Sequence, residues 1–124
     1  MRDASASGLT LSTFTAPRAP LGLVFDRAGV LGAGYRGGGF VLGWTPGDPA
    51  GDSLPGPFKD ASQDLLHLRR PPRGSMRHGL SARRIVGGFD RPVDAELVGD
   101  RIFVLEWGGN QGLWEVTLPG VGRP

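Results

Sequence analysis

The sequence contains no cysteine, only one lysine (Lys59) and only two histidines, His67 and His78. Without cysteine, disulfide bonds and thiolate metal sites are excluded, and the cellular compartment is not fixed. His67 lies within a predicted strand and His78 in a loop, and neither has a second histidine at ligand spacing. A zinc site is therefore not expected, and no other metal site is assigned to this chain.

The excess of positive charge is also small, because 14 Lys and Arg residues face 12 Asp and Glu residues and leave a net charge of +2. Such a charge gives little non-specific attraction to nucleic acid or anionic lipid. No apolar run is long enough to span a membrane, and residues 1–7 lack the apolar core of a signal peptide. We therefore expect neither a nucleic-acid partner nor a membrane span.

Helical periodicity is missing as well, since the one short candidate, Lys59–Arg70, runs into two prolines. Glycine and proline are abundant instead: 22 Gly and 11 Pro residues cluster between apolar runs, which indicates the turns of an all-β protein rather than disorder. We expect residues 1–8 to be disordered and residues 119–124 to form a tail. The predicted strands are Leu9–Thr15, Leu21–Asp26, Phe40–Trp44, Leu65–Arg69, Ala82–Val86, Val93–Val98, Ile102–Trp107 and Leu113–Leu118.

The last three predicted strands form a meander. Val93–Val98 and Ile102–Trp107 flank Gly99-Asp100, and glycine at the first central position of a two-residue loop suits a type II′ turn. The middle strand is apolar at every position of Ile102–Leu105, so the sequence predicts that it is buried on both faces between other sheets. This is the environment of a strand in a β-propeller blade.

A weak internal repeat extends this interpretation, because Phe-Val-Leu-x-Trp occurs at residues 40–44 and again at residues 103–107. The chain is therefore predicted to be an all-β partial propeller, with an outer strand at 9–15, a four-stranded blade at 21–86 and an incomplete blade at 93–118. Propellers close their ring with typically 4–8 blades. We expect the chain to be the C-terminal piece of a longer protein; the alternatives are that it oligomerises or folds poorly alone.

Three segments carry a resemblance to a known family. Over Pro20–Phe25, Tyr35–Val41 and Phe89–Thr117, the chain resembles the C-terminal part of the glucose/sorbosone dehydrogenase family domain. The resemblance implies a six-bladed propeller that oxidises a sugar or aldose hydroxyl with pyrroloquinoline quinone and calcium. It also implies that the remaining blades are partners of this chain, and a periplasmic or secreted location if an upstream signal exists.

The resemblance also suggests which residues contact the cofactor. Arg91 matches a basic residue that often begins the inner strand of the last blade, where its guanidinium could pair with a cofactor carboxylate. Trp44, a second candidate for contact with the cofactor, stands where the family often begins His-Gly-Ser-Trp-Asn-Arg, so that histidine is absent. Asp64 stands where lysine is common. The family's catalytic histidine belongs to an early blade outside this sequence, so no catalytic residue is assigned.

The residues themselves leave alternatives for each candidate. Asp94, the third candidate for contact with the cofactor, shares a strand face with Glu96. Such a pair could bind a cation or do acid–base work, or could form an ordinary polar face. Arg91 could instead pair with Asp90 or Asp94, and Trp44 could pack within the blade rather than line the central cleft. The alternative function is a non-catalytic binding propeller that has lost the cofactor site. A small standalone interaction module is the third hypothesis.

Overall fold

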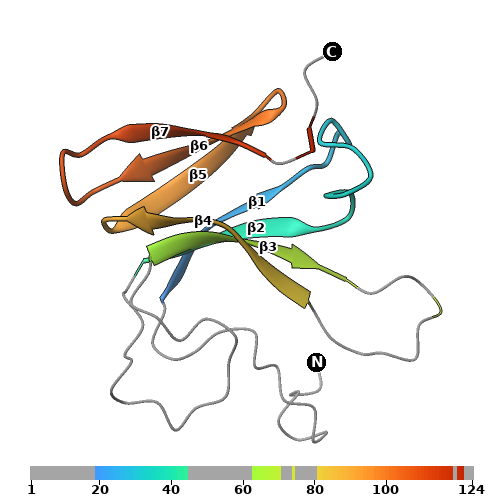
Figure 1. The fold of residues 1–124 in the computed structure, drawn as a ribbon, viewed down its shortest axis with the longest axis horizontal. Helices are drawn as coiled ribbons and strands as arrows, with labels where there is room; N and C mark the ends of the chain where they lie inside the picture. The colour runs from blue at the N-terminus through green and yellow to red at the C-terminus, as the bar shows by residue number, and fades with distance from the viewer. Residues whose placement is uncertain (1–18, 45–62, 71–73, 75–80, 119, 122–124) are drawn as a thin grey trace, which may run out of the picture.

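The structure, a computed structural model, describes residues 19–44, 63–70, 74, 81–118 and 120–121. Within these residues the regular elements are strands, which form two antiparallel sheets, neither of them closed (Figure 1). The all-β prediction is confirmed, while the expected strand Leu9–Thr15 and the expected disorder of residues 1–8 lie outside the described residues. The strands are β1 (Pro20–Phe25), β2 (Gly39–Gly43), β3 (Gln63–Arg69), β4 (Ser81–Phe89), β5 (Pro92–Val98), β6 (Arg101–Glu106) and β7 (Leu113–Thr117).

The four-stranded sheet has the order β1-β2-β3-β4, so each strand pairs with its neighbour in the sequence. This is the arrangement predicted for residues 21–86. All five residues of β2 are buried, as are the first five of β3. A strand that is buried on both of its faces is typically a near-continuous apolar run, as in Phe40–Leu42 and Leu65–Leu66.

The three-stranded sheet has the order β5-β6-β7. Val98 pairs with Arg101, which leaves Gly99-Asp100 as a two-residue loop. Gly99 has φ 61°, whereas Asp100 does not have a positive φ. One positive φ at the first central residue is the signature of the type II′ turn, so this prediction is confirmed.

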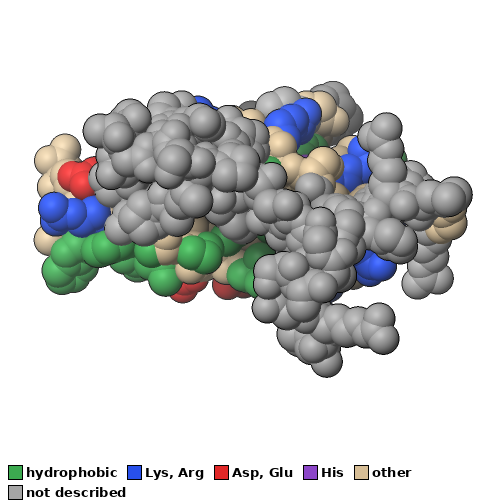
Figure 2. All heavy atoms as spheres, turned by 90° about the horizontal axis from the view of Figure 1, so that it is seen from below, with side chains coloured by type: hydrophobic (Ala, Val, Ile, Leu, Met, Phe, Trp, Pro, Cys, Tyr) green, Lys and Arg blue, Asp and Glu red, His purple; other side chains and the backbone are tan. Residues whose placement is uncertain are grey.

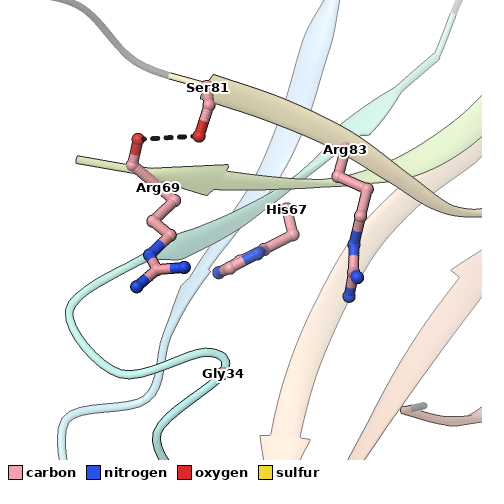
Figure 3. Close-up of a pocket in the computed structure, with 5 residues that line it drawn as sticks. All are labelled: Gly34, His67, Arg69, Ser81 and Arg83. Carbon is pink, nitrogen blue, oxygen red and sulfur yellow. Dashed lines mark hydrogen bonds between the residues drawn. The ribbon is translucent and has the colours of Figure 1, made fainter. Parts of the chain in front are cut away.

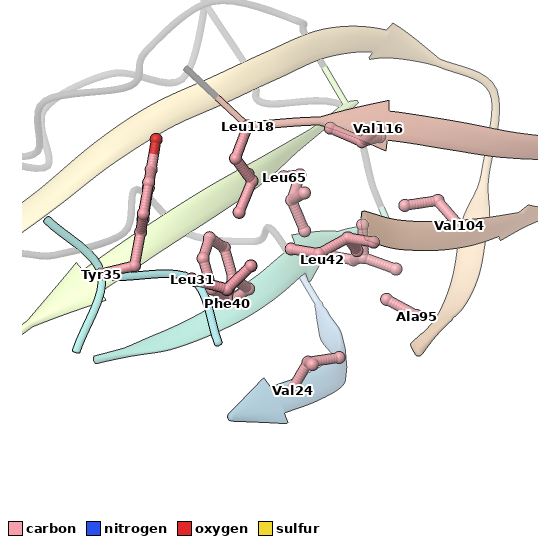
Figure 4. Packing of buried hydrophobic residues seen from close by; sticks show 11 residues of the cluster. Val24, Leu31, Tyr35, Phe40, Leu42, Leu65, Ala95, Val104, Val116 and Leu118 are labelled. Atoms are coloured by element: carbon pink, nitrogen blue, oxygen red, sulfur yellow. The ribbon is translucent and has the colours of Figure 1, made fainter. Parts of the chain in front are cut away.

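The hydrophobic core lies between the two sheets. Side chains of both sheets meet there, as Figure 4 shows for Leu42 and Leu65 on one side and Val104 and Val116 on the other. The loop between β1 and β2 contributes two further buried side chains that extend this core cluster; they are Leu31 and Tyr35. The Asp26 carboxylate stabilises this loop, because it accepts hydrogen bonds from the backbone N–H groups of Val30 and Leu31 at 3.0 and 2.9 Å.

The first strands of the two sheets lie against each other at Gly22. A Cβ atom placed on Gly22 would lie 2.9 Å from the backbone nitrogen of Ala95 and 3.1 Å from the Cα of Asp94, both in β5. Gly22 also has φ +55°, a conformation that L-residues other than glycine rarely adopt. Glycine at this position therefore allows the close approach of β1 and β5 that joins the two sheets.

The expectation that the middle strand of the last sheet is buried on both faces is wrong for the described residues. Ile102 and Val104 are fully buried, but Leu105 is 47% exposed. The reason is that the four-stranded sheet covers only the face of β6 that carries Ile102 and Val104. On the other face, Leu105 pairs with Leu113, which is 67% exposed, and no described element covers them.

We call this uncovered side the outer face of the three-stranded sheet. By strand alternation and register it carries Val98, Phe103, Leu105 and Leu113 together with Glu96 and other polar side chains. Figure 2, the view from below, shows hydrophobic side chains gathered along the lower left edge of the molecule with acidic side chains beside them. Adjacent apolar side chains of this kind mark a surface that another molecule or another part of a protein can cover.

Candidate functional site

The side-chain amide of Gln63 hydrogen-bonds to the backbones of Arg91 and Trp44, two of the three residues predicted to contact the cofactor. Gln63, the first residue of β3, accepts the N–H of Arg91 at 2.7 Å through Oε1. Its Nε2 donates to the backbone carbonyl of Trp44. The backbone of Arg91 is held from the other side too, because its carbonyl accepts the N–H of Trp107 at 3.0 Å. The structure therefore brings the backbones of Arg91 and Trp44 together at one end of the four-stranded sheet, through a residue that sequence reasoning did not identify.

The guanidinium of Arg91 is available for binding. Its side chain is 57% exposed, and its Nε lies 3.9 Å from Oδ1 of Asp90, the outer limit of an ion pair. An exposed pair of this length contributes little to stability, so it competes weakly with an incoming anion. Arg91 has φ 53°, an unusual value for arginine, which the hydrogen bonds on both sides of its peptide maintain.

The two carboxylates near Arg91 have structural partners. Glu106, which is buried, accepts the N–H of Asp90 at 2.9 Å and the indole N–H of Trp114. Asp90 accepts the N–H of Gly109 at 2.6 Å. Both carboxylates thus fix the connection before β5 and the loop after β6, and both oxygens of Glu106 already have donors. Nothing in the sequence singled out Glu106, because a lone acid in an apolar strand resembles a surface residue.

Asp94 does not join Arg91 and Trp44. It lies two residues into β5, is exposed, and accepts the N–H of the next residue, Ala95, at 2.9 Å. Its cross-strand partner is Leu105, and that of Glu96 is Phe103, so the predicted common face of the two acids is the outer face of the three-stranded sheet. Within the described ranges, no three acidic or histidine side chains are arranged to hold a metal ion.

Asp64 is fully buried. Its Oδ2 accepts a hydrogen bond from Nε of Arg84 at 2.8 Å, which makes an ion pair between β3 and β4. Burying a carboxylate is costly unless it is paired and hydrogen-bonded, and Arg84 meets that need. Asp64 therefore belongs to the interior of the sheet, not to a surface that a cofactor could reach.

The Gln63 amide gives a direct test of how this end of the sheet is held. Gln63→Leu removes both hydrogen bonds and leaves the Arg91 N–H and the Trp44 carbonyl without a partner, so we expect a loss of about 1–3 kcal/mol in the free energy of unfolding. Urea unfolding followed by tryptophan fluorescence measures it. Thr117→Val, an exposed polar-to-apolar change in β7, is the control and should stay within about 0.5 kcal/mol of the original chain. Equal values for the two variants would contradict the role of Gln63.

A second group of polar side chains lies at the opposite end of the four-stranded sheet. In the β3–β4 pairing, His67 is opposite Arg83 and Arg69 is opposite Ser81, so the four residues occupy one face of the hairpin. Together with Gly34 they line a cavity of about 170 Å³, which we call the arginine–histidine pocket (Figure 3).

His67 is the buried member of this pocket, with only 4% of its surface exposed. Its ring packs against the rings of Tyr35 and Phe40, with centroids 5.1 and 4.9 Å away. Nε2 has no hydrogen-bond partner among the described residues. A Cβ atom on Gly38 would collide with Nε2, so glycine at that position leaves room for the ring.

The pKa of His67 is lowered from its ordinary value, chiefly because burial disfavours the charged imidazolium. A hydrogen bond to the backbone of Tyr35 acts in the opposite direction, and the positive charges of Arg83 and Arg69 lower the pKa further. Because Nε2 has no partner, the bond to Tyr35 involves Nδ1. The neutral ring therefore keeps Nδ1–H toward the Tyr35 backbone and presents the lone pair of Nε2 to the pocket.

Sequence reasoning missed this pocket because it looked for a second histidine at the spacing of a metal site. A usable signal was present in the two predicted strands: His67 and Arg69 share one face of Leu65–Arg69, and Arg83 is a basic residue of Ala82–Val86. What the sequence could not supply was the register that places Arg83 opposite His67.

The described residues include no helix with the length and apolarity needed to cross a membrane. Comparison of the chain with protein family models, with curated proteins and with solved structures finds no match.

Proposed function

We propose that this chain forms two neighbouring blades of a propeller of the glucose/sorbosone dehydrogenase type. Further blades would complete the ring, and the whole protein would oxidise a sugar or aldose hydroxyl with bound pyrroloquinoline quinone. The observation that carries the proposal is the packing of two consecutive antiparallel meanders, whose first strands, β1 and β5, touch at Gly22. Radially repeated meanders packed in this way make up a propeller.

The outer face of the three-stranded sheet supports the need for further blades. Val98, Leu105 and Leu113 are each about half or more exposed there. A propeller blade has a neighbour on both faces, so these side chains would be covered by the next blade. The strand β7 has only one hydrogen-bonded neighbour in the described sheet, which leaves its other edge for a fourth strand.

The fit of the described residues to the cofactor is partial. Arg91 is exposed and weakly paired, so it fits one carboxylate of the quinone, which carries several. Trp44 lies near it through Gln63, whereas Asp94 lies on the outer face. No described group of acids suits calcium. The remaining contacts to the quinone and the ligands of calcium would therefore come from residues beyond those described.

A non-catalytic binding propeller is the second candidate, and Asp64 favours it. Where lysine is common in the family, this chain has a buried carboxylate whose charge is taken up by Arg84. A buried carboxylate paired with Arg84 offers no cation to an acidic cofactor. The histidine commonly found at the place of Trp44 is missing as well.

Quinone titration and an activity assay distinguish the two candidates. The reading frame that contains this sequence is expressed, loaded with pyrroloquinoline quinone and calcium, and tested for dye reduction with aldoses. The dehydrogenase proposal predicts turnover, and Arg91→Gln should weaken quinone binding about 10-fold or more.

The control is Arg27→Gln, which should leave quinone affinity unchanged. Arg27 is an exposed arginine two residues after the C-terminal end of β1. If the protein neither binds quinone nor reduces dye, the dehydrogenase proposal is overturned in favour of the binding propeller. Quinone binding without turnover on any aldose would also overturn it.

A further inference from the structure

We propose that the arginine–histidine pocket binds a phosphate group and that His67 takes up a proton as the anion enters. The pocket lies at the end of the four-stranded sheet opposite to Arg91, and the proposal does not depend on the activity proposed above. No covalent step is involved. A proton from solvent moves to Nε2 of His67, and the anion gains a donor in return.

The arginines supply the charge that such a ligand needs. Each guanidinium presents several N–H donors in a planar fork that matches the oxygens of a phosphate. Neither Arg69 nor Arg83 has an acidic partner among the described residues. In Figure 3 the side chains of His67, Arg69 and Arg83 all leave the β3–β4 hairpin toward the loop that carries Gly34. Two unneutralised cations converge on one small space, which favours a doubly charged anion.

Neighbouring groups orient the side chain of Arg83, whereas the hydroxyl of Ser81 can change its hydrogen-bond partner. Arg83 donates to the hydroxyl of Tyr35 at 3.2 Å and lies over its ring, with 5.7 Å between the guanidinium carbon and the centroid. Arg83 is thus oriented before a ligand arrives, which lowers the entropic cost of binding. Ser81 donates to the carbonyl of Arg69 at 3.4 Å, a long bond that its hydroxyl can exchange for one to an anion.

His67 is the observation that points to an incoming ligand. Its buried Nε2 lacks a partner among the described residues, although buried polar atoms of folded proteins are nearly always hydrogen-bonded. The charged or titratable groups around the ring are Arg69 on its own strand, Arg83 on β4 and Tyr35 in the loop. A bound anion offsets the repulsion of the two arginines, raises the pKa of His67 and turns Nε2 into a donor toward the anion.

The size of the pocket limits the ligand. About 170 Å³ is below the roughly 300–1,000 Å³ of sites that enclose drug-sized molecules. A single tetrahedral oxyanion fits the space, and Arg69, Ser81 and Arg83 are exposed, so it can enter from solvent. The anion can be free phosphate or the phosphate group of a small monoester whose remainder stays outside.

Calorimetric titration of the 124-residue chain with inorganic phosphate tests the site. We expect Arg69→Gln and Arg83→Gln each to weaken binding about 10-fold or more. The matched control is Arg70→Gln, which removes the same charge from an exposed residue just after β3 that does not line the pocket. Circular dichroism verifies that each variant keeps its strands. Equal loss in all three variants, or no binding in the low millimolar range, would overturn the site.

Sulfate tests the proton uptake, because its charge stays constant between about pH 5 and pH 8, where histidine titrates. Sulfate should bind more tightly as pH falls, and it should raise the pKa of His67 measured by NMR of the imidazole. A pH-independent sulfate affinity with an unchanged His67 pKa would overturn this part. Comparison of inorganic phosphate with glycerol 3-phosphate then identifies the source. Tighter binding of inorganic phosphate supports free phosphate as the ligand, and tighter binding of glycerol 3-phosphate supports a phosphorylated metabolite.

Discussion

Asp64→Ala is expected to lower the free energy of unfolding by about 3 kcal/mol, because it leaves the guanidinium of Arg84 without its buried counter-ion. Breaking a buried pair in this way costs about 3–5 kcal/mol in other proteins, and the 28% exposure of the Arg84 side chain places this pair at the lower end of that range. Small domains are stable by only about 5–15 kcal/mol, so the loss is severe. Urea unfolding followed by circular dichroism measures it.

The double variant Asp64→Leu with Arg84→Met is the companion experiment. It replaces both charges by apolar side chains of similar length and should recover most of the loss, because neither side chain is then left as an unpaired charge. If Asp64→Ala alone costs less than about 1 kcal/mol, the ion pair does not support the sheet and the expectation fails.

Gly22→Ala is expected to cost about 2–5 kcal/mol, which is the second large effect. Part of the loss, about 1–2 kcal/mol, is the cost of a non-glycine residue at φ +55°. The rest is steric, because the new methyl group meets the backbone of Ala95 at 2.9 Å and the side chain of Leu42 at 3.0 Å. Crowding of this kind adds about 1–3 kcal/mol. Thermal and urea unfolding give the value.

The matched control for this variant is Gly99→Ala. Gly99 has φ +61°, close to the value at Gly22, but a Cβ atom there meets nothing within 4 Å. Gly99→Ala should therefore show the conformational cost alone. The difference between the two variants reports the contact between β1 and β5, and a difference near zero would contradict the packing of the two sheets at this point.

The strands were largely predictable because glycine and proline separate them so clearly. The seven predicted strands from Leu21 onward all exist, with ends that shift by a few residues. The largest shift is in β4, which continues beyond Val86 to Phe89 through Gly87 and Gly88. Glycine is disfavoured inside strands, so the sequence indicated an end there, whereas pairing with Gln63 and Asp64 continues the strand through an irregular register.

Burial on the two faces of a strand was less predictable. Four consecutive apolar residues at Ile102–Leu105 show that both faces of β6 are suited to burial, but not what covers each one. The four-stranded sheet covers one face, and the described residues leave the other exposed. Which face of β6 is covered depends on tertiary packing, and a local sequence pattern carries no information about that.

The sites depended on long-range pairs that no local pattern reveals. The Gln63 side chain bonds residues 19 and 28 positions away. It also precedes the apolar run that predicted its strand, so nothing marked it. The Arg91 and Trp44 assignments came from the resemblance, and the structure brings these two residues to one amide. The Asp94 assignment came from strand alternation, which correctly predicted a face shared with Glu96 but could not tell which side of the sheet that face was on.

The order of the strands has a consequence for the speed of folding. Among the described strands, every hydrogen-bonded pair joins strands that follow each other in the chain, so each sheet can grow one hairpin at a time. The β5–β6 hairpin closes over two residues and β6–β7 over a short loop, whereas β2 and β3 must close residues 44–62 between them. Loop closure costs more entropy as the loop lengthens, so the three-stranded sheet should form first. The strand β1 would then pack against β5 of the sheet that has already formed.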